Sequence, residues 1–241
     1  MHYFDPLIRD DLPEAIVDQL NPEWFVKREN ASTVPQTPWP PEAVKILSTY
    51  FTQVWKGKKV KELIAAYNAN SLFSSGTIAA INAWYNQADK LENCNLGIDF
   101  KEFLNLSAKQ TVGLIGYFYP VLNYLRSETD KIYIFELEAG EDFIEPKQQP
   151  VFLPKCDVVI CTGSTLVNGT FDQVMHNISP QALVTLVGPT VPMIPQVFRE
   201  TKVDYLAGSV VVNSELLLER IKAGQGGRDL KKCLQKAVCR M

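Results

Sequence analysis

Five short apolar runs in the second half of the chain constrain its fold more than any other feature. Each consists mostly of Val, Ile, Leu, Tyr and Phe, in continuous rather than alternating order: TVGLIG, KIYIFELE, CDVVICTG, ALVTLVGP and VDYLAGSVV. Strands of a parallel sheet that is covered on both faces have this composition. Helical patterns separate most of the runs: YPVLNYLRS, NGTFDQVMHNI, IPQVFRET and NSELLLERIKAG. The alternation predicts an α/β fold with an open, mostly parallel, Rossmann-like sheet and right-handed crossovers.

The residues before this alternation predict a smaller, largely helical domain. Apolar residues at helical spacing occur in PPEAVKILSTYFTQVW, KVKELIAAYN and SLFSSGTIAAINAWYNQADKL, and LENCNLGID then breaks the pattern. We therefore predict an N-terminal domain over residues 1–97 and a sheet domain over 98–241. At the C-terminus, RDLKKCLQKAVCR has apolar residues on one helical side and basic residues on the rest, which predicts a docked surface helix.

Composition excludes several function classes. A net charge of −3 gives no excess of positive charge to attract nucleic acid. No apolar stretch approaches the roughly 20 residues that cross a bilayer, and acids at the start argue against a signal peptide, so we expect a cytoplasmic protein. Aromatic residues in the first 60 positions are compatible with a homodimer.

Cysteine and histidine usage bears on metal sites. The five cysteines form no C-x-x-C pair, which favours buried or idle thiols over a disulfide framework or a zinc site. Only two histidines occur, His2 and His176, so a His-rich metal site within one chain is excluded. A bound metal would need carboxylates, a thiol or the donors of a ligand.

Ligands of open parallel sheets bind beyond the carboxyl ends of the strands, where four segments here carry polar residues or glycines. The first is GLIGYFYP, in which Gly116 permits a tight bend and the following helix start presents N–H groups to an anion. The second contains Glu136, which follows Gly116 by 20 residues, the spacing of the acid that accepts ribose hydroxyls in nucleotide-binding sheets. A solvated carboxylate and a merely structural turn are the alternatives.

The third and fourth strand ends carry hydroxyls, an amide and glycines. TGSTLVNGT supplies six small residues whose mixed donors and acceptors suit a neutral polar or carboxylate group better than a triphosphate: Thr162, Gly163, Ser164, Asn168, Gly169 and Thr170. Helix capping accounts for one or two of them. Gly188, Pro189 and Thr190 of LVGPTVPMIP predict a rigid wall or a plain connection. Ser164 lacks a G-x-S-x-G elbow, which argues against a Ser-His triad.

These strand-end motifs together resemble one known family, DUF364, described as putative heavy-metal chelation proteins. GLIGYF, DVVICTGSTLVNGT, LVGPTVPM and VDYLAGSVV carry the resemblance, and GTIAAINA is similar to a helix of the associated DUF4213 domain. The resemblance implies an enolase N-terminal-like domain, a Rossmann-like domain, and a site between them for a flavin-, pterin- or siderophore-like molecule. It assigns ligand-binding positions to Gly113, Gly116, Phe118, Glu136, Thr162, Gly163, Ser164, Asn168, Gly169, Thr170, Gly188, Pro189, Thr190 and Asn82. The first 70 residues depart from the family's β-rich pattern, which indicates a shortened or replaced subdomain.

Three functions remain open at this stage. The first is a protein that binds or processes a small polar, metal-chelating molecule, with Glu136 accepting hydrogens and Asn168 and Thr170 orienting the ligand. The second is a methyltransferase that uses S-adenosylmethionine, and the third is a noncatalytic carrier or sensor of a metal chelate. No residue stands out as a nucleophile, so the catalytic residues and the metal remain unassigned.

Overall fold

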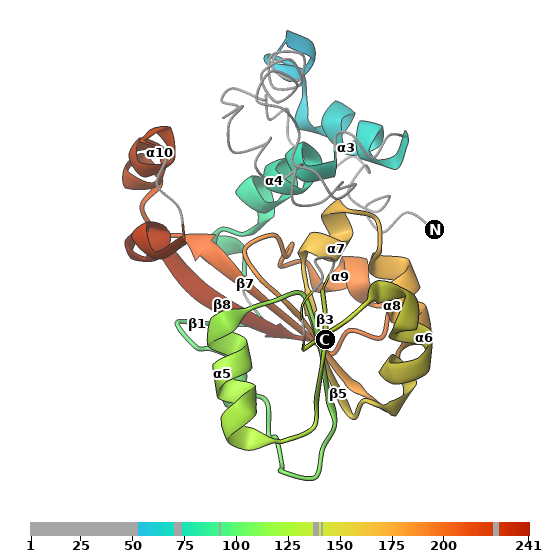
Figure 1. Ribbon diagram of the computed structural model, residues 1–241. Coiled ribbons are helices and arrows are strands. Elements are labelled where there is room, and N and C mark those ends of the chain that lie inside the picture. The colour runs from blue at the N-terminus through green and yellow to red at the C-terminus, as the bar shows by residue number, and fades with distance from the viewer. Residues whose placement is uncertain (1–52, 70–73, 92, 137–139, 141, 224–226) are drawn as a thin grey trace. The chain divides into compact units, whose positions relative to one another are not determined.

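The computed structural model describes residues 53–69, 74–91, 93–136, 140, 142–223 and 227–241 (Figure 1). The chain divides into two compact units. The sheet unit contains residues 93–165, 170–208 and 236–241, and the other unit contains 166–169, 209–235 and the described part of 1–92. The helix predicted over residues 40–55 lies almost entirely outside the described residues. The predicted domain boundary at residue 97 stays a prediction.

The strands form one sheet with the order β1-β8-β7-β6-β5-β2-β3-β4. The pairs from β4 through β7 are all parallel, whereas β1 and β8 are antiparallel. The prediction of an open, mostly parallel α/β sheet is therefore confirmed. The strands are β1 (Cys94–Leu96), β2 (Val112–Ile115), β3 (Ile132–Phe135), β4 (Phe143–Ile144), β5 (Val158–Thr162), β6 (Leu183–Val187), β7 (Tyr205–Val211) and β8 (Leu234–Arg240).

Helices follow most strands, as the alternating pattern predicts. They are α3 (Val60–Ala69), α4 (Ser74–Tyr85), α5 (Tyr119–Glu128), α6 (Gln149–Phe152), α7 (Ser164–Val167), α8 (Phe171–Asn177), α9 (Pro195–Phe198) and α10 (Ser214–Lys222). Short 3-10 helices span Ala88–Lys90, Phe100–Glu102, Pro146–Gln148, Leu153–Lys155 and Gly227–Cys233. Within the described residues, no helix has the length and apolar character that a membrane crossing requires.

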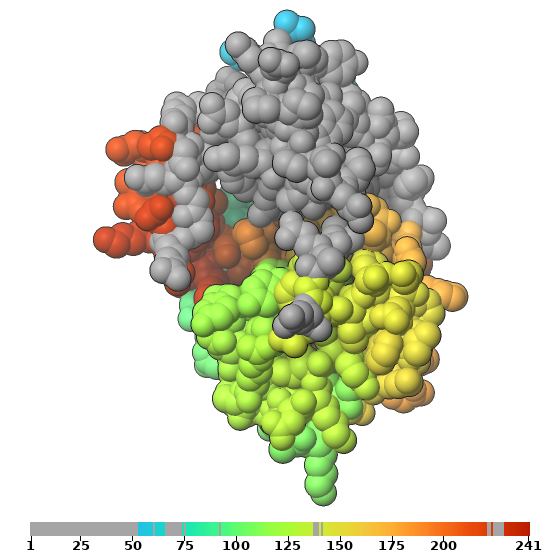
Figure 2. Space-filling view, in the orientation of Figure 1, coloured from blue at the N-terminus to red at the C-terminus, as the bar shows by residue number. Residues whose placement is uncertain are grey.

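Both faces of the central strands are covered, which explains their continuous apolar composition. Leu114 and Ile160 belong to a buried cluster that includes Leu122 of α5. The opposite face carries Gly113, where a Cβ atom would lie 3.0 Å from the Sγ atom of Cys156. The outer surfaces of α5 (green) and α6 (yellow) are visible in Figure 2.

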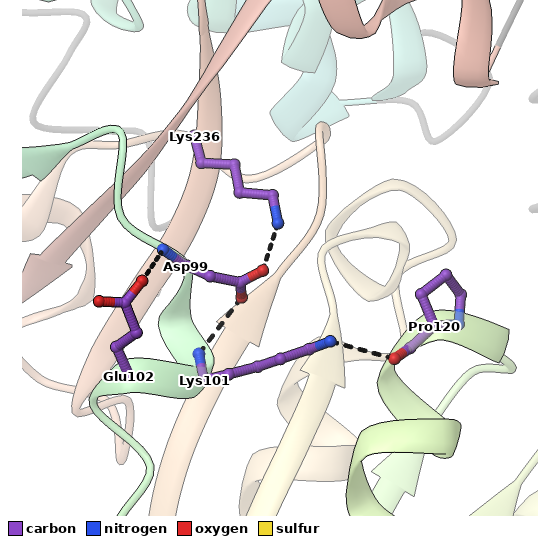
Figure 3. A network of polar contacts seen from close by, with 5 residues as sticks. All are labelled: Asp99, Lys101, Glu102, Pro120 and Lys236. Carbon is purple, nitrogen blue, oxygen red and sulfur yellow. Dashed lines mark hydrogen bonds and ion pairs between the residues drawn. The ribbon is translucent and has the colours of Figure 1, made fainter.

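A polar network joins the 3-10 helix at residues 100–102 to β8 and to α5 (Figure 3). The Asp99 carboxylate caps this helix by accepting the N–H of Lys101 at 3.3 Å, and it also pairs with Lys236 of β8. The Lys101 ammonium donates to the carbonyl of Pro120 at 3.1 Å. Burial raises the pKa of Asp99, but the Lys236 and Lys101 contacts outweigh burial and leave that pKa below its usual value.

The C-terminal segment corrects two sequence-based predictions. Residues 234–240 form strand β8 rather than a surface helix, and Cys239 forms a disulfide with Cys94 of β1 instead of remaining an idle thiol. Ala237, Val238 and Cys239 are all buried. Three consecutive buried residues are typical of a strand that is covered on both faces, whereas Ala237 and Val238 also lie at helical spacing from Cys233 and Leu234, which explains the wrong prediction.

The described part of the other unit is built on the pair α3 and α4. Leu63 of α3 and Ile78 and Ile81 of α4 are at most 1% exposed. The Thr77 hydroxyl of α4 donates to the carbonyl of Leu63 at 3.0 Å, which ties the two helices together. Two of the predicted helical segments therefore form helices, α3 and α4, that pack against each other.

Removing the disulfide should lower stability, because the bond between Cys94 and Cys239 closes a loop across 145 residues of sequence. We expect the double substitution Cys94→Ser, Cys239→Ser to reduce the free energy of unfolding by about 2–4 kcal/mol in urea titrations. Dithiothreitol should destabilise the wild-type protein by a similar amount and leave the double variant unaffected. Equal stability of the oxidised and reduced wild-type protein would contradict the prediction.

Thr185 in β6 predicts a stabilising substitution. Its side chain is fully buried, and its hydroxyl has no hydrogen-bond partner among the residues that the structure describes. Thr185→Val should raise the free energy of unfolding by about 1 kcal/mol, because it removes an unsatisfied hydroxyl at nearly constant shape. The control is Thr129→Val, which should lower stability because the buried Thr129 hydroxyl donates to the Gln110 carbonyl at 2.8 Å. If both substitutions change the free energy of unfolding in the same direction, the interpretation that the Thr185 hydroxyl lacks a hydrogen bond is refuted.

Candidate functional site

The direction of chain progression reverses between β2 and β5. From β2 the chain proceeds through β3 to β4 on one side, whereas from β5 it proceeds through β6 to β7 on the other. Counted from β2, the order across these six parallel strands is 3-2-1-4-5-6, the order of dinucleotide-binding sheets. Such sheets bind ligands outside the carboxyl ends of the strands at this switch point. A ligand site is therefore expected at the ends of β2 and β5.

The ends of β2 and β5 approach each other closely at Gly116 and Thr162. Gly116 has φ +88°, and a Cβ atom at this position would lie 3.1 Å from the Cγ2 atom of Thr162. The Thr162 hydroxyl accepts the N–H of Ser164 at 3.2 Å, which fixes the start of α7. Glycine is thus required at position 116 both by its backbone conformation and by the contact with Thr162.

Glu136 brings the end of β3 to the same place. Its Oε2 atom accepts the backbone N–H of Tyr117 at 2.7 Å. Ile115 pairs with Phe135 on one side and with Cys161 on the other, so the next residues along all three strands lie in one row. This row contains Gly116, Glu136 and Thr162, which the sequence predicted to lie at neighbouring strand ends.

Two exposed tyrosines flank this row, and sequence reasoning did not select them. Tyr117 is 47% exposed and Tyr119 is 58% exposed, large fractions for aromatic residues next to buried strands. The Tyr117 ring packs against Phe143 of β4 with centroids 5.3 Å apart. Phe118, which was predicted to contact the ligand, is half-buried and precedes α5 as its N-cap. The motif GLIGYFYP could have identified these two tyrosines, because its aromatic residues directly follow the bend at Gly116.

The ends of β5 and β6 are packed against each other. A Cβ atom on Gly163 would lie 2.7 Å from the Thr190 hydroxyl and 2.8 Å from the Cγ2 atom of Val191. Gly163 and Thr190 are both buried. Gly188 has φ +127°, and its carbonyl accepts the Val191 N–H at 3.1 Å across a turn that contains Pro189. These residues form a tightly packed turn, and the predicted wall of a ligand site stays a prediction.

The N–H groups of three glycines at these strand ends donate to carbonyl groups of neighbouring strands. The N–H of Gly116 donates to Phe135, that of Gly163 to Val187, and that of Gly188 to Ala207, at distances of 2.8–2.9 Å. Each bond continues the sheet ladder by one residue. These three amides are therefore already paired within the sheet.

Of the five remaining predicted positions, two belong to the sheet unit and three to the other compact unit. Gly113 is buried inside β2, where it makes room for Cys156 and Leu153, and it has a packing role. Thr170 precedes α8, and its N–H donates to the Thr165 carbonyl at 3.1 Å. Asn82, Asn168 and Gly169 belong to the other compact unit. We define the switch-point cluster by residues of the sheet unit alone: Gly116, Tyr117, Tyr119, Glu136, Thr162 and Ser164.

The described residues do not fit a bare heavy-metal ion. They contain no group of three or more His, Cys, Asp or Glu side chains that could hold one. Burial raises the pKa of the Cys156 and Cys161 thiols to about 12 each, so both stay protonated at neutral pH. Metals bind the thiolate, and these two thiols are therefore poor ligands.

The contact between Gly116 and Thr162 can be tested by a double-mutant cycle. Gly116→Ala should lower the free energy of unfolding by about 1–3 kcal/mol, because it adds a methyl group at positive φ against Thr162. Thr162→Ser removes the Cγ2 atom, so the double variant should recover part of this loss in urea titrations. Strict additivity of the two changes would show that the residues are not in contact.

Comparison with known proteins identifies relatives of this chain. The family model described as "Putative heavy-metal chelation" (DUF364) matches residues 99–240. An uncharacterised protein of Methanocaldococcus jannaschii is 28% identical over 123 residues, which are 49% of this chain and 48% of that protein. The chain thus spans about half the length of this curated relative.

Two solved structures of DUF364 proteins of unknown function share the fold. One, from Pyrococcus horikoshii, is 27% identical with a TM-score of 0.69 and covers 77% of this chain and 76% of its own. The other, from Desulfitobacterium hafniense, is 23% identical with a TM-score of 0.74 and covers 99% of this chain and 96% of its own. Because the family model matches more than half of the sequence, this chain belongs to the DUF364 family.

Proposed function

We propose that this protein binds a small polar molecule at the switch-point cluster. One observation supports the proposal: residues at the ends of β2, β3 and β5 contact one another directly at the switch point. The Glu136 carboxylate bonds to Tyr117 at 2.7 Å, and Gly116 lies against Thr162. Tight contacts at strand ends hold side chains in fixed positions before a ligand arrives, which lowers the entropic cost of binding.

The side chains of the cluster favour a ring compound with hydroxyl or amino groups. Glu136 can accept hydrogens from such groups, and the hydroxyl of the half-buried Ser164 can donate or accept. The exposed rings of Tyr117 and Tyr119 offer apolar surface with a polar tip. A flavin-, pterin- or siderophore-like molecule combines these features.

The family description connects this proposal to metals through the ligand. Heavy-metal chelation is what the family is described as doing, whereas the described residues do not fit a bare ion. A chelator that carries its own oxygen or nitrogen donors needs only to be held by the protein. Glu136 and the tyrosines would then contact the organic part of the ligand, which orients it for whatever reaction or transfer follows.

Direct binding of candidate ligands tests the proposal. We would titrate the protein with riboflavin, neopterin, ferric 2,3-dihydroxybenzoate and S-adenosylmethionine, and follow the backbone amide signals of Tyr117 and Ser164 by NMR. At least one ligand should shift both signals, and Glu136→Ala should weaken its binding at least fivefold, because a hydrogen-bond acceptor to the ligand is lost.

The matched control is Ser179→Ala, a polar residue that precedes β6 at its amino end and bonds only locally to Gln181. This variant should bind as the wild-type protein does. If none of the four ligands shifts the two signals, or if both variants weaken binding equally, the proposal is refuted. A shift with S-adenosylmethionine alone would favour methyl transfer instead.

A further inference from the structure

We propose that the disulfide between Cys94 and Cys239 is a redox control of the switch-point cluster. Its reduction releases strand β1, and with β1 the segment that holds the first turn of α5, which begins at Tyr119. This regulation rests on the proposed function, because it acts on the same site. All the groups involved belong to the sheet unit.

The disulfide joins a short edge strand to the rest of the sheet. Strand β1 has three residues and lies at the end of the strand order, where β8 is its only neighbouring strand in the described part of the chain. All three residues pair with β8, and the disulfide links the first of these pairs, Cys94 with Cys239. Short edge elements open locally at a low cost in free energy, so the covalent bond contributes much of what holds β1 in place.

Burial makes Cys94 the residue that a reductant attacks. Cys239 is fully buried, whereas Cys94 is half-buried on the edge strand. A thiolate of a dithiol reductant attacks the Sγ atom of Cys94, and the S–S bond breaks with its electron pair on the Sγ atom of Cys239, which takes up a proton. The second thiol of the reductant then attacks the mixed disulfide and releases Cys94 as a thiol. Two electrons and two protons thus pass to the protein, and the reductant leaves as a cyclic disulfide.

A series of polar contacts, which we call the relay, connects β1 to α5 (Figure 3). The chain leaves β1 through Gly97, whose N–H donates to the Lys236 carbonyl at 2.8 Å, and then reaches Asp99, which pairs with the Lys236 ammonium. Asp99 also accepts the N–H of Lys101 at 3.3 Å, and the Lys101 ammonium donates to the Pro120 carbonyl at 3.1 Å. The docking of β1 on β8 is therefore linked to the first turn of α5.

Apolar packing reinforces the relay. Phe100 lies between Asp99 and Lys101 in the chain and belongs to the same buried cluster as Val121 and Leu122 of α5. The N–H groups of Val121 and Leu122 both donate to the carbonyl of Phe118, the residue between the two exposed tyrosines. Coupling between distant positions requires such a contiguous network and an element with two arrangements, here β1 docked or detached. Detachment of β1 thus loosens the turn that positions both tyrosines.

Reduction of the protein without any ligand tests the relay. We would compare oxidised protein with protein that has been reduced by dithiothreitol and desalted under nitrogen, and follow backbone amide signals by NMR. The signals of Tyr119 and Val121 should shift or broaden on reduction, whereas that of Val174 in α8, outside the relay, should not. The double variant Cys94→Ser, Cys239→Ser should show the reduced pattern with and without dithiothreitol. Unchanged signals of Tyr119 and Val121 would overturn the proposal.

A single substitution tests whether the effect passes through Lys101. Lys101→Met removes the ammonium that bonds to Pro120 and keeps a flexible apolar side chain, so reduction should change the Tyr119 signal less than in the wild-type protein. The matched control is Lys109→Met, which makes the same change in net charge at an exposed lysine of the same unit and should keep the full response. Equal responses of the two variants would refute the relay.

Ligand binding connects the relay to the proposed function. We would titrate the oxidised and the reduced protein with riboflavin and with neopterin by isothermal titration. For a compound that binds, the dissociation constant should rise about threefold or more on reduction, because a smaller fraction of the protein keeps the binding-competent arrangement. Equal affinities of the two forms would overturn the proposed regulation while the proposed function stands. If neither compound binds either form, the proposed function fails for flavins and pterins, and the regulation fails with it.

Discussion

The parallel pairing of β2 with β5 is the interaction on which the rest of the structure depends. The four residue pairs in this register run from Val112 with Val158 to Ile115 with Cys161, and all eight residues are buried. Because the chain leaves β2 in one direction and β5 in the other, this single pairing creates the switch point. It also places Gly116 against Thr162, so the packing of the core fixes the geometry of the candidate site.

Much of the sheet could be predicted from the sequence, because a strand that is covered on both faces needs only a short continuous apolar run. The five predicted runs contain β2, β3, β5, β6 and β7. The failures have a common physical cause: β1 and β8 are defined by long-range pairing. Cys94 and Cys239 are 145 residues apart, and no local pattern predicts that they meet. The two-residue strand β4 likewise depends on its neighbour Ile134 rather than on its own composition.

The candidate site was predictable in position but not in detail. A motif that follows a strand can be assigned to the carboxyl edge of the sheet, and Gly116, Glu136 and Thr162 do share one row there. The function of each glycine was not predictable, since it depends on residues of other strands. Gly163 accommodates Thr190 and Val191, and its N–H completes the ladder to Val187. The exposure of Tyr117 and Tyr119 was not predictable either, because it depends on how the folded chain packs around them.

The strand-end amides have a consequence for how selectivity can arise in this fold. Here the ladder continues through Gly116, and Tyr117 is bonded to Glu136, so these two amides already have partners within the protein. A carboxylate offers about four acceptor positions, so Glu136 can keep the Tyr117 bond while it accepts a hydrogen from a ligand.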